Sequence, residues 1–167
     1  MDTTTIIVIA VAVAFAYIAL LLGLMSWMAT TAAKNTPPSI SHIPAQADIL
    51  QQVQKFALAY GYTKRPVSSH PNEHVFRRGR GWLTSLTDVC LRLNPDDGSA
   101  EIEVKEGVNF LYKITYFPIN ASTFLGLPVR QHKVKKINLL LTHLGANNIA
   151  FKKSPSNKPR RIKTHKS

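Results

Sequence analysis

The chain has 167 residues, of which 21 are Lys or Arg and nine are Asp or Glu, so its net charge is +12 at pH 7. Once one long apolar segment is set aside, this length leaves room for one ordinary domain. The single cysteine, Cys90, excludes an intramolecular disulfide, so the domain must be stabilised by a hydrophobic core. The excess positive charge favours anionic partners, such as nucleic acid or anionic lipid headgroups.

A transmembrane helix is predicted near the start of the chain. After a short N-terminal segment, residues 1–5, residues 6–28 form an apolar run of 23 residues without a charged side chain. A helix of that length spans about 34 Å, against a bilayer hydrocarbon core of about 30 Å. A cleavable signal peptide is the alternative, but such peptides have a basic start and an apolar stretch of only about 7–15 residues.

The distribution of positive charge predicts the orientation of this helix. No Lys or Arg precedes the helix, whereas Lys34 follows it closely and others lie further along the chain. Because Lys and Arg are enriched on the cytoplasmic side, we expect the N-terminus outside and the soluble domain in the cytoplasm. The reverse orientation stays open, since only Lys34 is near the membrane; Asn120 would then be a glycosylation acceptor in a eukaryotic host.

Small residues form a stripe along the predicted helix, with spacings of four, three, four and three residues. The helix-packing stripe consists of Ala12, Ala16, Ala19, Gly23 and Ser26. Small side chains let a neighbouring helix approach closely inside a membrane. The alternative is that alanine is simply common in apolar segments, and Ala10 and Ala14 do lie off the stripe. The stripe predicts a membrane-protein partner or self-association.

Residues 29–43 are rich in Thr, Ser and Pro and predict an extended linker between the helix and the domain. The soluble domain is expected at residues 44–151. Its first element should be a helix at 45–60, because apolar residues from Ile49 to Tyr60 recur on one helical face.

Two strands follow in the middle of the chain. Val89, Leu91 and Leu93 alternate with polar residues, and the segment 100–105 alternates in the same way, so each strand should have one polar face. Residues 94–98, Asn-Pro-Asp-Asp-Gly, are typical of the turn in a hairpin.

An earlier strand is expected at 74–83, bent near Gly79 and Gly81, and a later one at 110–117. A last helix should begin near Pro128 and end at Gly145. Its apolar side is formed by Val134, Ile137, Leu140, Leu141 and Leu144, and its polar side by Arg130, Lys133 and Lys136. The predicted fold class is therefore α+β: one N-terminal transmembrane helix, then a small soluble domain with an antiparallel β-meander flanked by two helices.

The last segment, 152–167, is expected to be a disordered basic tail, because it holds seven Lys and Arg and no acidic residue. Together with the stretch 77–82 it forms the candidate surface for anionic partners. The candidate residues are Arg77, Arg78, Arg80, Trp82, Lys152, Lys153, Lys158, Arg160, Arg161 and Lys163. In the first stretch, the guanidinium groups could bind phosphates while Trp82 stacks on a base or lies at a lipid interface. The alternative is a charged edge strand with Trp82 in the core.

One motif has the form of a metal site. The segment from His70 to His74 fits the H-x-x-E-H pattern of inverted zinc peptidases. That chemistry needs both histidines on one helical face, but Pro71 and Asn72 favour a turn followed by a strand. We therefore predict no catalytic residue, no metal and no cofactor. Cys90 with His132 or His143 is a further remote option, since the alternating pattern makes Cys90 a packed or solvated thiol.

These patterns favour a non-enzymatic, membrane-tethered accessory or assembly subunit. Its helix would dock on a membrane partner, and its basic domain and tail would contact a protein or anionic surface. The alternative is a membrane-linked nucleic-acid-binding protein. A membrane-associated metalloenzyme ranks third, because it would need a pocket with converging polar groups near His70, Glu73 and His74.

Overall fold

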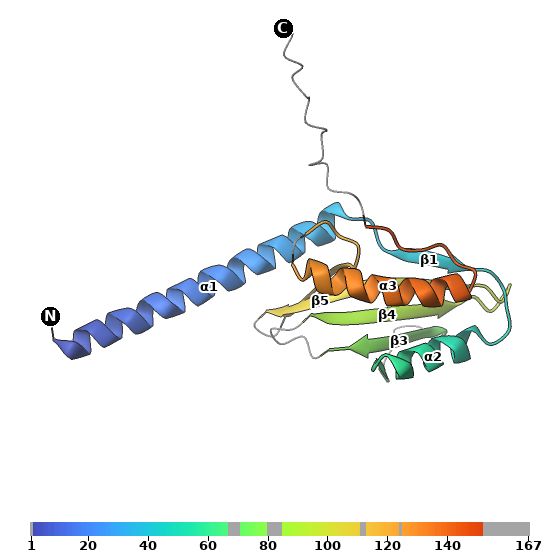
Figure 1. Ribbon diagram of the computed structural model, residues 1–167, viewed down its shortest axis with the longest axis horizontal. Helices are drawn as coiled ribbons and strands as arrows, with labels where there is room; N and C mark the ends of the chain where they lie inside the picture. Colours follow the sequence, from blue (N-terminus) through green and yellow to red (C-terminus); the bar gives the residue numbers. More distant parts are fainter. Residues whose placement is uncertain (1, 67–70, 80–84, 111–112, 124, 152–167) are drawn as a thin grey trace, which may run out of the picture.

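The computed structural model describes residues 2–66, 71–79, 85–110, 113–123 and 125–151. It confirms the predicted α+β class: a long apolar helix is followed by an antiparallel sheet and two further helices (Figure 1). The elements are α1 (Thr3–Asn35), β1 (Ile40–Ile43), α2 (Ile49–Ala59), β2 (Thr63–Lys64), β3 (Glu73–Arg78), β4 (Leu86–Leu93), β5 (Ala100–Phe110), β6 (Lys113–Pro118) and α3 (Leu127–His143).

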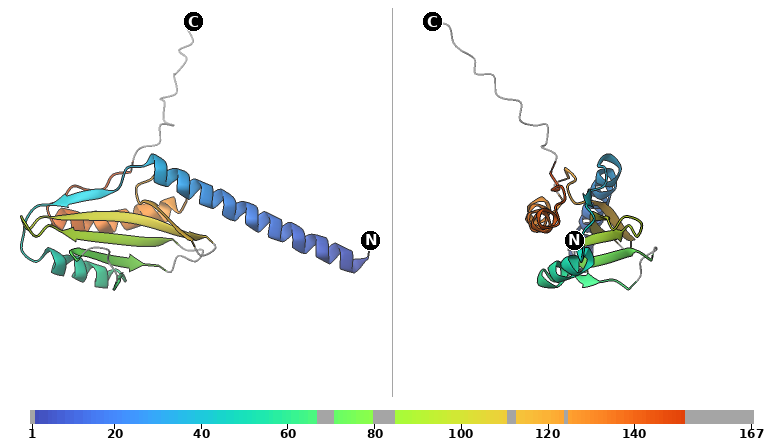
Figure 2. Two further views of the ribbon diagram at one scale, coloured as in Figure 1. Left: turned by 180° about the vertical axis from the view of Figure 1, so that it is seen from behind. Right: turned by 90° about the vertical axis from the view of Figure 1, so that its right-hand side faces the viewer.

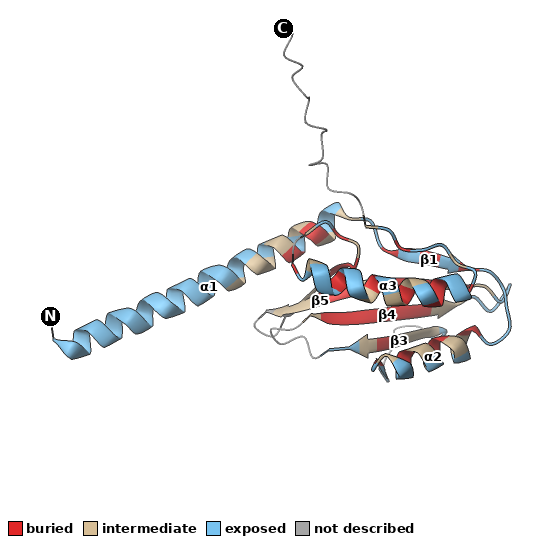
Figure 3. Ribbon diagram, in the orientation of Figure 1, coloured by how far each residue is buried: buried red, intermediate tan, exposed pale blue. Residues whose placement is uncertain are grey.

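The helix α1 is the one helix in the described residues that is long and apolar enough to span a membrane. It has 33 residues, and its most apolar 18-residue window has a mean hydropathy of 2.9. Figure 3 shows that most of α1 is exposed and that buried residues begin only where it meets the domain. In water, so large an exposed apolar surface would be unfavourable.

The sheet has the strand order β1-β5-β4-β3-β2, with β6 also paired to β5, and all these pairs are antiparallel. The predicted hairpin is present: β4 and β5 pair from Leu93 with Ala100 to Leu86 with Gly107. In its turn, Gly98 has a φ of 70°, a conformation that glycine adopts at little cost.

Both domain helices pack on the same face of the sheet, as the end-on view in Figure 2 shows. Val53 of α2 and Ile137 of α3 share one core with Leu91 and Ile102 of the central strands. The opposite face is polar, as the alternation predicts. Its charged residues form ion pairs, including Arg77 with Asp88 and Arg92 with Glu73 and Glu103.

The segment 29–43 differs from the extended linker predicted for it. Here α1 continues to Asn35, and β1 pairs with β5 through Ile40 opposite Glu103 and Ile43 opposite Ala100. The pairing joins segments about 60 residues apart, which short-range composition does not reveal. The predicted strand at 110–117 is also divided: Phe110 ends β5, and β6 begins at Lys113.

The last third of α1 is docked on the domain. Ala29 is fully buried and Ala32 nearly so, against Phe117 of β6 and against Ala121 and Leu125 of the loop that precedes α3. Leu22, Met25 and Met28 complete this contact from α1. The domain is therefore packed directly against the helix, and its position relative to α1 is set by side-chain packing.

Candidate functional site

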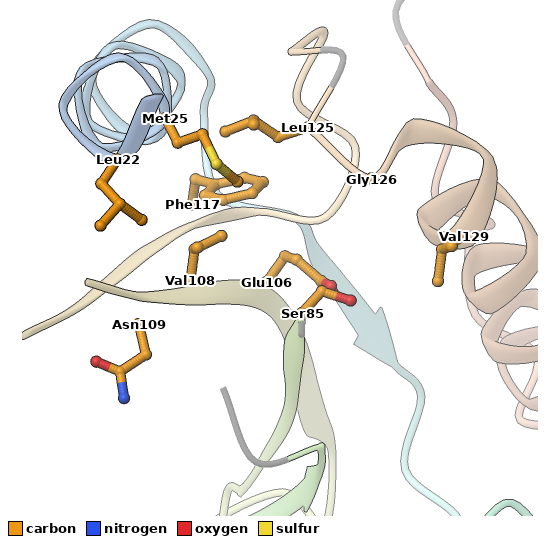
Figure 4. Close-up of a pocket in the computed structure, with 10 residues that line it drawn as sticks. All are labelled: Leu22, Met25, Ser85, Glu106, Val108, Asn109, Phe117, Leu125, Gly126 and Val129. Atoms are coloured by element: carbon orange, nitrogen blue, oxygen red, sulfur yellow. The ribbon is translucent and has the colours of Figure 1, made fainter. Parts of the chain in front are cut away.

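An apolar cavity of about 230 Å³ lies where α1 meets the domain (Figure 4). It is lined by Leu22, Met25, Ser85, Glu106, Val108, Asn109, Phe117, Leu125, Gly126 and Val129. In Figure 4, Leu22 and Met25 extend from α1 toward Val108 and Phe117, and Val129 lies across from them on α3. Six parts of the fold thus build the cavity: α1, the residue before β4, β5, β6, the loop before α3, and α3 itself.

A basic cleft of about 770 Å³ adjoins the apolar cavity, because Ser85 and Val129 line both. The cleft is lined by Arg78, Gly79, Ser85, Pro128, Val129, His132, Lys133 and Lys136. It lies between the end of β3 and the first half of α3. The two compartments together have an apolar part and a cationic part.

Lys133 and Glu106 form a buried ion pair at the boundary between the two compartments. The Lys133 Nζ donates to Glu106 Oε1 at 2.8 Å, to Ser85 Oγ at 2.9 Å and to Thr87 Oγ1 at 2.6 Å. The Thr87 hydroxyl donates to the other Glu106 oxygen at 2.8 Å. Because an ammonium group has three donors, Lys133 is fully engaged and acts as a fixed structural cation.

Arg130 organises the loop on which α1 docks. Its side chain is fully buried, and its guanidinium donates to the carbonyl oxygens of Ile119 and Ala121 at 2.8 Å, of Leu125 at 2.9 Å, and of Thr123. Burial lowers the pKa of this guanidinium from its usual value, and the Glu106 charge opposes that shift. The expectation that Arg130 lies on the polar side of the last helix is wrong, because these carbonyls supply its hydrogen bonds inside the protein.

The charge around the cleft is predominantly positive. All nine acidic residues lie in the described part of the chain, and Glu106 alone among them lines either compartment. The sequence contains no Asp or Glu after Glu106. Since Lys133 neutralises Glu106, the cleft keeps the positive charges of Arg78 and Lys136, for which the described residues show no carboxylate partner. The arrangement suits a ligand with an anionic group and an apolar group.

The structure separates the predicted anionic-surface residues. Arg77 lies on the polar sheet face, where it donates two hydrogen bonds to Asp88, at 2.8 and 2.7 Å, and one to the hydroxyl of Tyr116. Arg78 is exposed and lines the basic cleft. The remaining predicted members, Arg80, Trp82, Lys152, Lys153, Lys158, Arg160, Arg161 and Lys163, lie outside the described residues.

The small-residue stripe is not the face of α1 that packs on the domain. Ala12, Ala16, Ala19 and Gly23 are exposed, and a Cβ built on Gly23 would meet no atom within 4 Å. Ser26 is half-buried. The docking residues Leu22 and Met25 each precede a stripe residue by one position, and successive residues of a helix are about 100° apart. The stripe is therefore left accessible.

The segment resembling a peptidase motif does not have the required geometry. Glu73 accepts from Arg92 at 3.0 Å, and Glu73 and His74 lie on the strand β3, whereas His70 lies outside the described residues. In the described part of the chain, no three His, Cys, Asp or Glu side chains gather closely enough for a metal ion.

Cys90 is a buried thiol on the sheet. Burial raises its pKa from 9.0 to about 11, against a smaller opposing effect of Lys105. Thiolate formation is therefore disfavoured, whereas a catalytic cysteine needs a lowered pKa. This agrees with the interpretation of Cys90 as a packed thiol.

Of the residues that line the two compartments, only Arg78 belonged to the site predicted from the sequence. Val129 and Leu125 are ordinary apolar residues in sequence, and the cavity forms only when β5, β6 and α3 are brought to α1. One signal was available: three basic residues at Lys133, Lys135 and Lys136 in a region without acids. Comparison with protein-family models, with curated proteins and with solved structures found no match to this chain.

Proposed function

We propose that this protein is a non-enzymatic, membrane-anchored accessory or assembly subunit. In this proposal α1 crosses the membrane and packs on another membrane helix, and the domain lies at the membrane surface with its basic cleft toward anionic groups. The orientation with the domain in the cytoplasm is part of the proposal, following the positive charge after the helix.

The observation that carries the proposal is the docking of α1 on the domain. Ala29 and Ala32 are buried against the domain, while the preceding apolar residues of α1, up to Leu21, are exposed. A helix that only anchored a domain would need no such contact, since a flexible linker retains a domain equally well. Rigid coupling instead suits a protein whose domain must keep a fixed position relative to a partner or to the bilayer.

The accessible stripe supports the partner-binding part of the proposal. Gly23 and Ala16 lie on a side of α1 that the domain does not cover, so a second helix can approach there without displacing the domain.

The test is purification of the tagged full-length protein in mild detergent, followed by mass spectrometry of retained proteins and measurement of oligomeric state. A variant with Ala16→Leu and Gly23→Leu should lose at least about 80% of the retained membrane partner, or of the second copy, because bulky side chains block close helix approach. The matched control is Ala10→Leu with Ala14→Leu, which adds bulk off the stripe and should leave retention unchanged.

Two results would contradict the proposal. Equal loss of partner in the stripe and control variants would show that the stripe is not the contact. Recovery of nucleic acid, lost on nuclease treatment and at moderate salt, with no membrane protein retained, would instead favour a membrane-linked nucleic-acid-binding protein.

A further inference from the structure

We infer that the apolar cavity and the basic cleft together bind one anionic phospholipid from the adjoining membrane leaflet. Part of an acyl chain would occupy the apolar cavity, and the phosphate would lie in the basic cleft. The inference rests on the proposed function, because it requires α1 to lie in a bilayer.

The size and lining of the cavity suit a segment of hydrocarbon. Its volume is about 230 Å³, and its lining includes the apolar side chains of Leu22, Met25, Val108, Phe117 and Leu125. An apolar protein cavity of about 150 Å³ stays free of water and takes up benzene. The present cavity therefore accommodates part of one acyl chain, whereas the rest of the lipid must remain outside it.

The adjoining cleft complements a phosphate group. Arg78 and Lys136 line it without a carboxylate partner among the described residues, and His132 lies beside them. A guanidinium binds phosphate oxygens in a bidentate geometry, and an ammonium adds a point charge. Lys133 contributes by holding the Glu106 carboxylate, which removes the one nearby negative charge that would repel the ligand.

The position of the two compartments selects a membrane lipid over a soluble phosphate compound. Leu22 and Met25 belong to α1 itself, directly after the exposed apolar stretch. Figure 1 shows that α1 projects from the end of the domain where β3 ends and α3 begins, the elements that supply Arg78 and Lys136. A lipid beside α1 thus reaches both compartments while its remaining chain stays in the bilayer.

The test is native mass spectrometry of the detergent-solubilised full-length protein after incubation with equal amounts of dioleoyl-phosphatidylglycerol and dioleoyl-phosphatidylcholine. We expect one phosphatidylglycerol retained per chain in preference to phosphatidylcholine. Val129→Trp, which places a large ring where the two compartments join, should reduce retention at least about tenfold. Val129 is 53% exposed, so the ring can be accommodated without disturbing the core.

Matched controls lie on the same helix. Leu139→Trp adds the same ring at an exposed position, 65% accessible, that lines neither compartment, and it should leave lipid retention unchanged. Arg78→Ala with Lys136→Ala should lower the preference for phosphatidylglycerol about tenfold or more, because each cation near an anionic lipid contributes about 1 kcal/mol, or about fivefold. Lys135 is an exposed residue outside the cleft, so Lys135→Ala should not change the preference for phosphatidylglycerol.

Three outcomes would overturn the inference: no lipid retained, equal retention of the two lipids, or equal effects of Val129→Trp and Leu139→Trp. Competition by 10 mM glycerol phosphate that displaced the lipid completely would also overturn it, since the acyl chain would then contribute nothing. Membrane fractionation of the same variants separates this failure from failure of the proposed function. If Val129→Trp stays in the membrane with its protein partner but loses no lipid, the lipid site alone is wrong.

Discussion

Arg130 shows how one buried charge can determine a functional surface. Its guanidinium donates hydrogen bonds to four backbone carbonyls of the loop between β6 and α3. The guanidinium carbon, Cζ, lies 5.4 Å from the centre of the Phe117 ring. The helix α1 packs on that loop and on Phe117, so Arg130 stabilises the surface on which α1 docks. The planar fork of five donors suits this task better than the three donors of lysine.

Replacing Arg130 should therefore lower the stability of the protein strongly. Arg130→Met leaves buried carbonyls without donors, at about 1–3 kcal/mol for each group, so we expect a loss of at least about 3 kcal/mol. Thermal unfolding of the full-length protein in detergent, followed by circular dichroism, should show a decrease of at least about 6 °C. Lys135→Met, at an exposed position of the same helix, should change stability by less than about 0.5 kcal/mol. Equal effects of the two changes would refute the structural role of Arg130.

Cys90 offers a second measurement at a single residue. Because its pKa is raised from 9.0 to about 11, the thiolate fraction of the folded protein at pH 8 should be about 100-fold lower than that of the unfolded chain. Alkylation by iodoacetamide at pH 8 should be slower in the native protein by at least that factor. A native rate near the denatured rate would contradict the buried position.

The same shift predicts how stability depends on pH. A raised folded pKa means that the contribution of the Cys90 thiol is fully present below pH 9.0 and is lost as the pH rises toward 11. The unfolding temperature of the wild type should therefore fall more steeply over this range than that of Cys90→Ala, which has no thiol to ionise. Parallel curves for the two proteins would count against the shift.

Among the elements, the parts with local signals were predictable and those that depend on distant pairing were not. The alternation around Cys90 and the turn residues at 94–98 predicted the β4–β5 hairpin. The spacing of Ile137 and Leu141 predicted the buried side of α3. The strand β1 and the end of α1 could not be foreseen, because their partners in β5 and β6 lie far along the chain. For the same reason, the stripe was visible in the sequence, whereas the docking face was not.

The docking of α1 makes its own prediction. Ala29→Trp places a large ring in a fully buried position, and overpacking of this kind costs about 1–3 kcal/mol. The last turns of α1 should then detach more often, exposing Lys34 to trypsin, and cleavage after Lys34 should accelerate about tenfold. Thr30→Trp, on an exposed side of the same turn, should leave the rate unchanged. Unchanged cleavage in Ala29→Trp would mean that docking does not protect this segment.

At the scale of the whole molecule, charge and apolar surface have separate locations along the chain. All acidic residues lie at or before Glu106, and the sheet uses several of them in ion pairs on its polar face. In the later part of the chain, including α3, every charged residue is a Lys or an Arg. Because α3 begins, and β3 ends at Arg78, at the end of the domain from which α1 projects, part of the unneutralised charge lies toward the apolar helix (Figure 1). A domain built in this way should lie on an anionic bilayer with α3 toward the surface.

Lysine labelling in nanodiscs tests that arrangement. In nanodiscs containing phosphatidylglycerol, Lys135 and Lys136 should be acetylated at least about threefold more slowly than in phosphatidylcholine nanodiscs, because anionic headgroups attract and cover α3. Lys55 on α2, which lies across the domain from α1 (Figures 1 and 2), is the internal control and should react equally in both. At about 1 M salt the Debye length falls to about 3 Å, so the protection should disappear. Protection that persists at high salt, or that is equal on Lys55, would mean that charge does not orient the domain on the membrane.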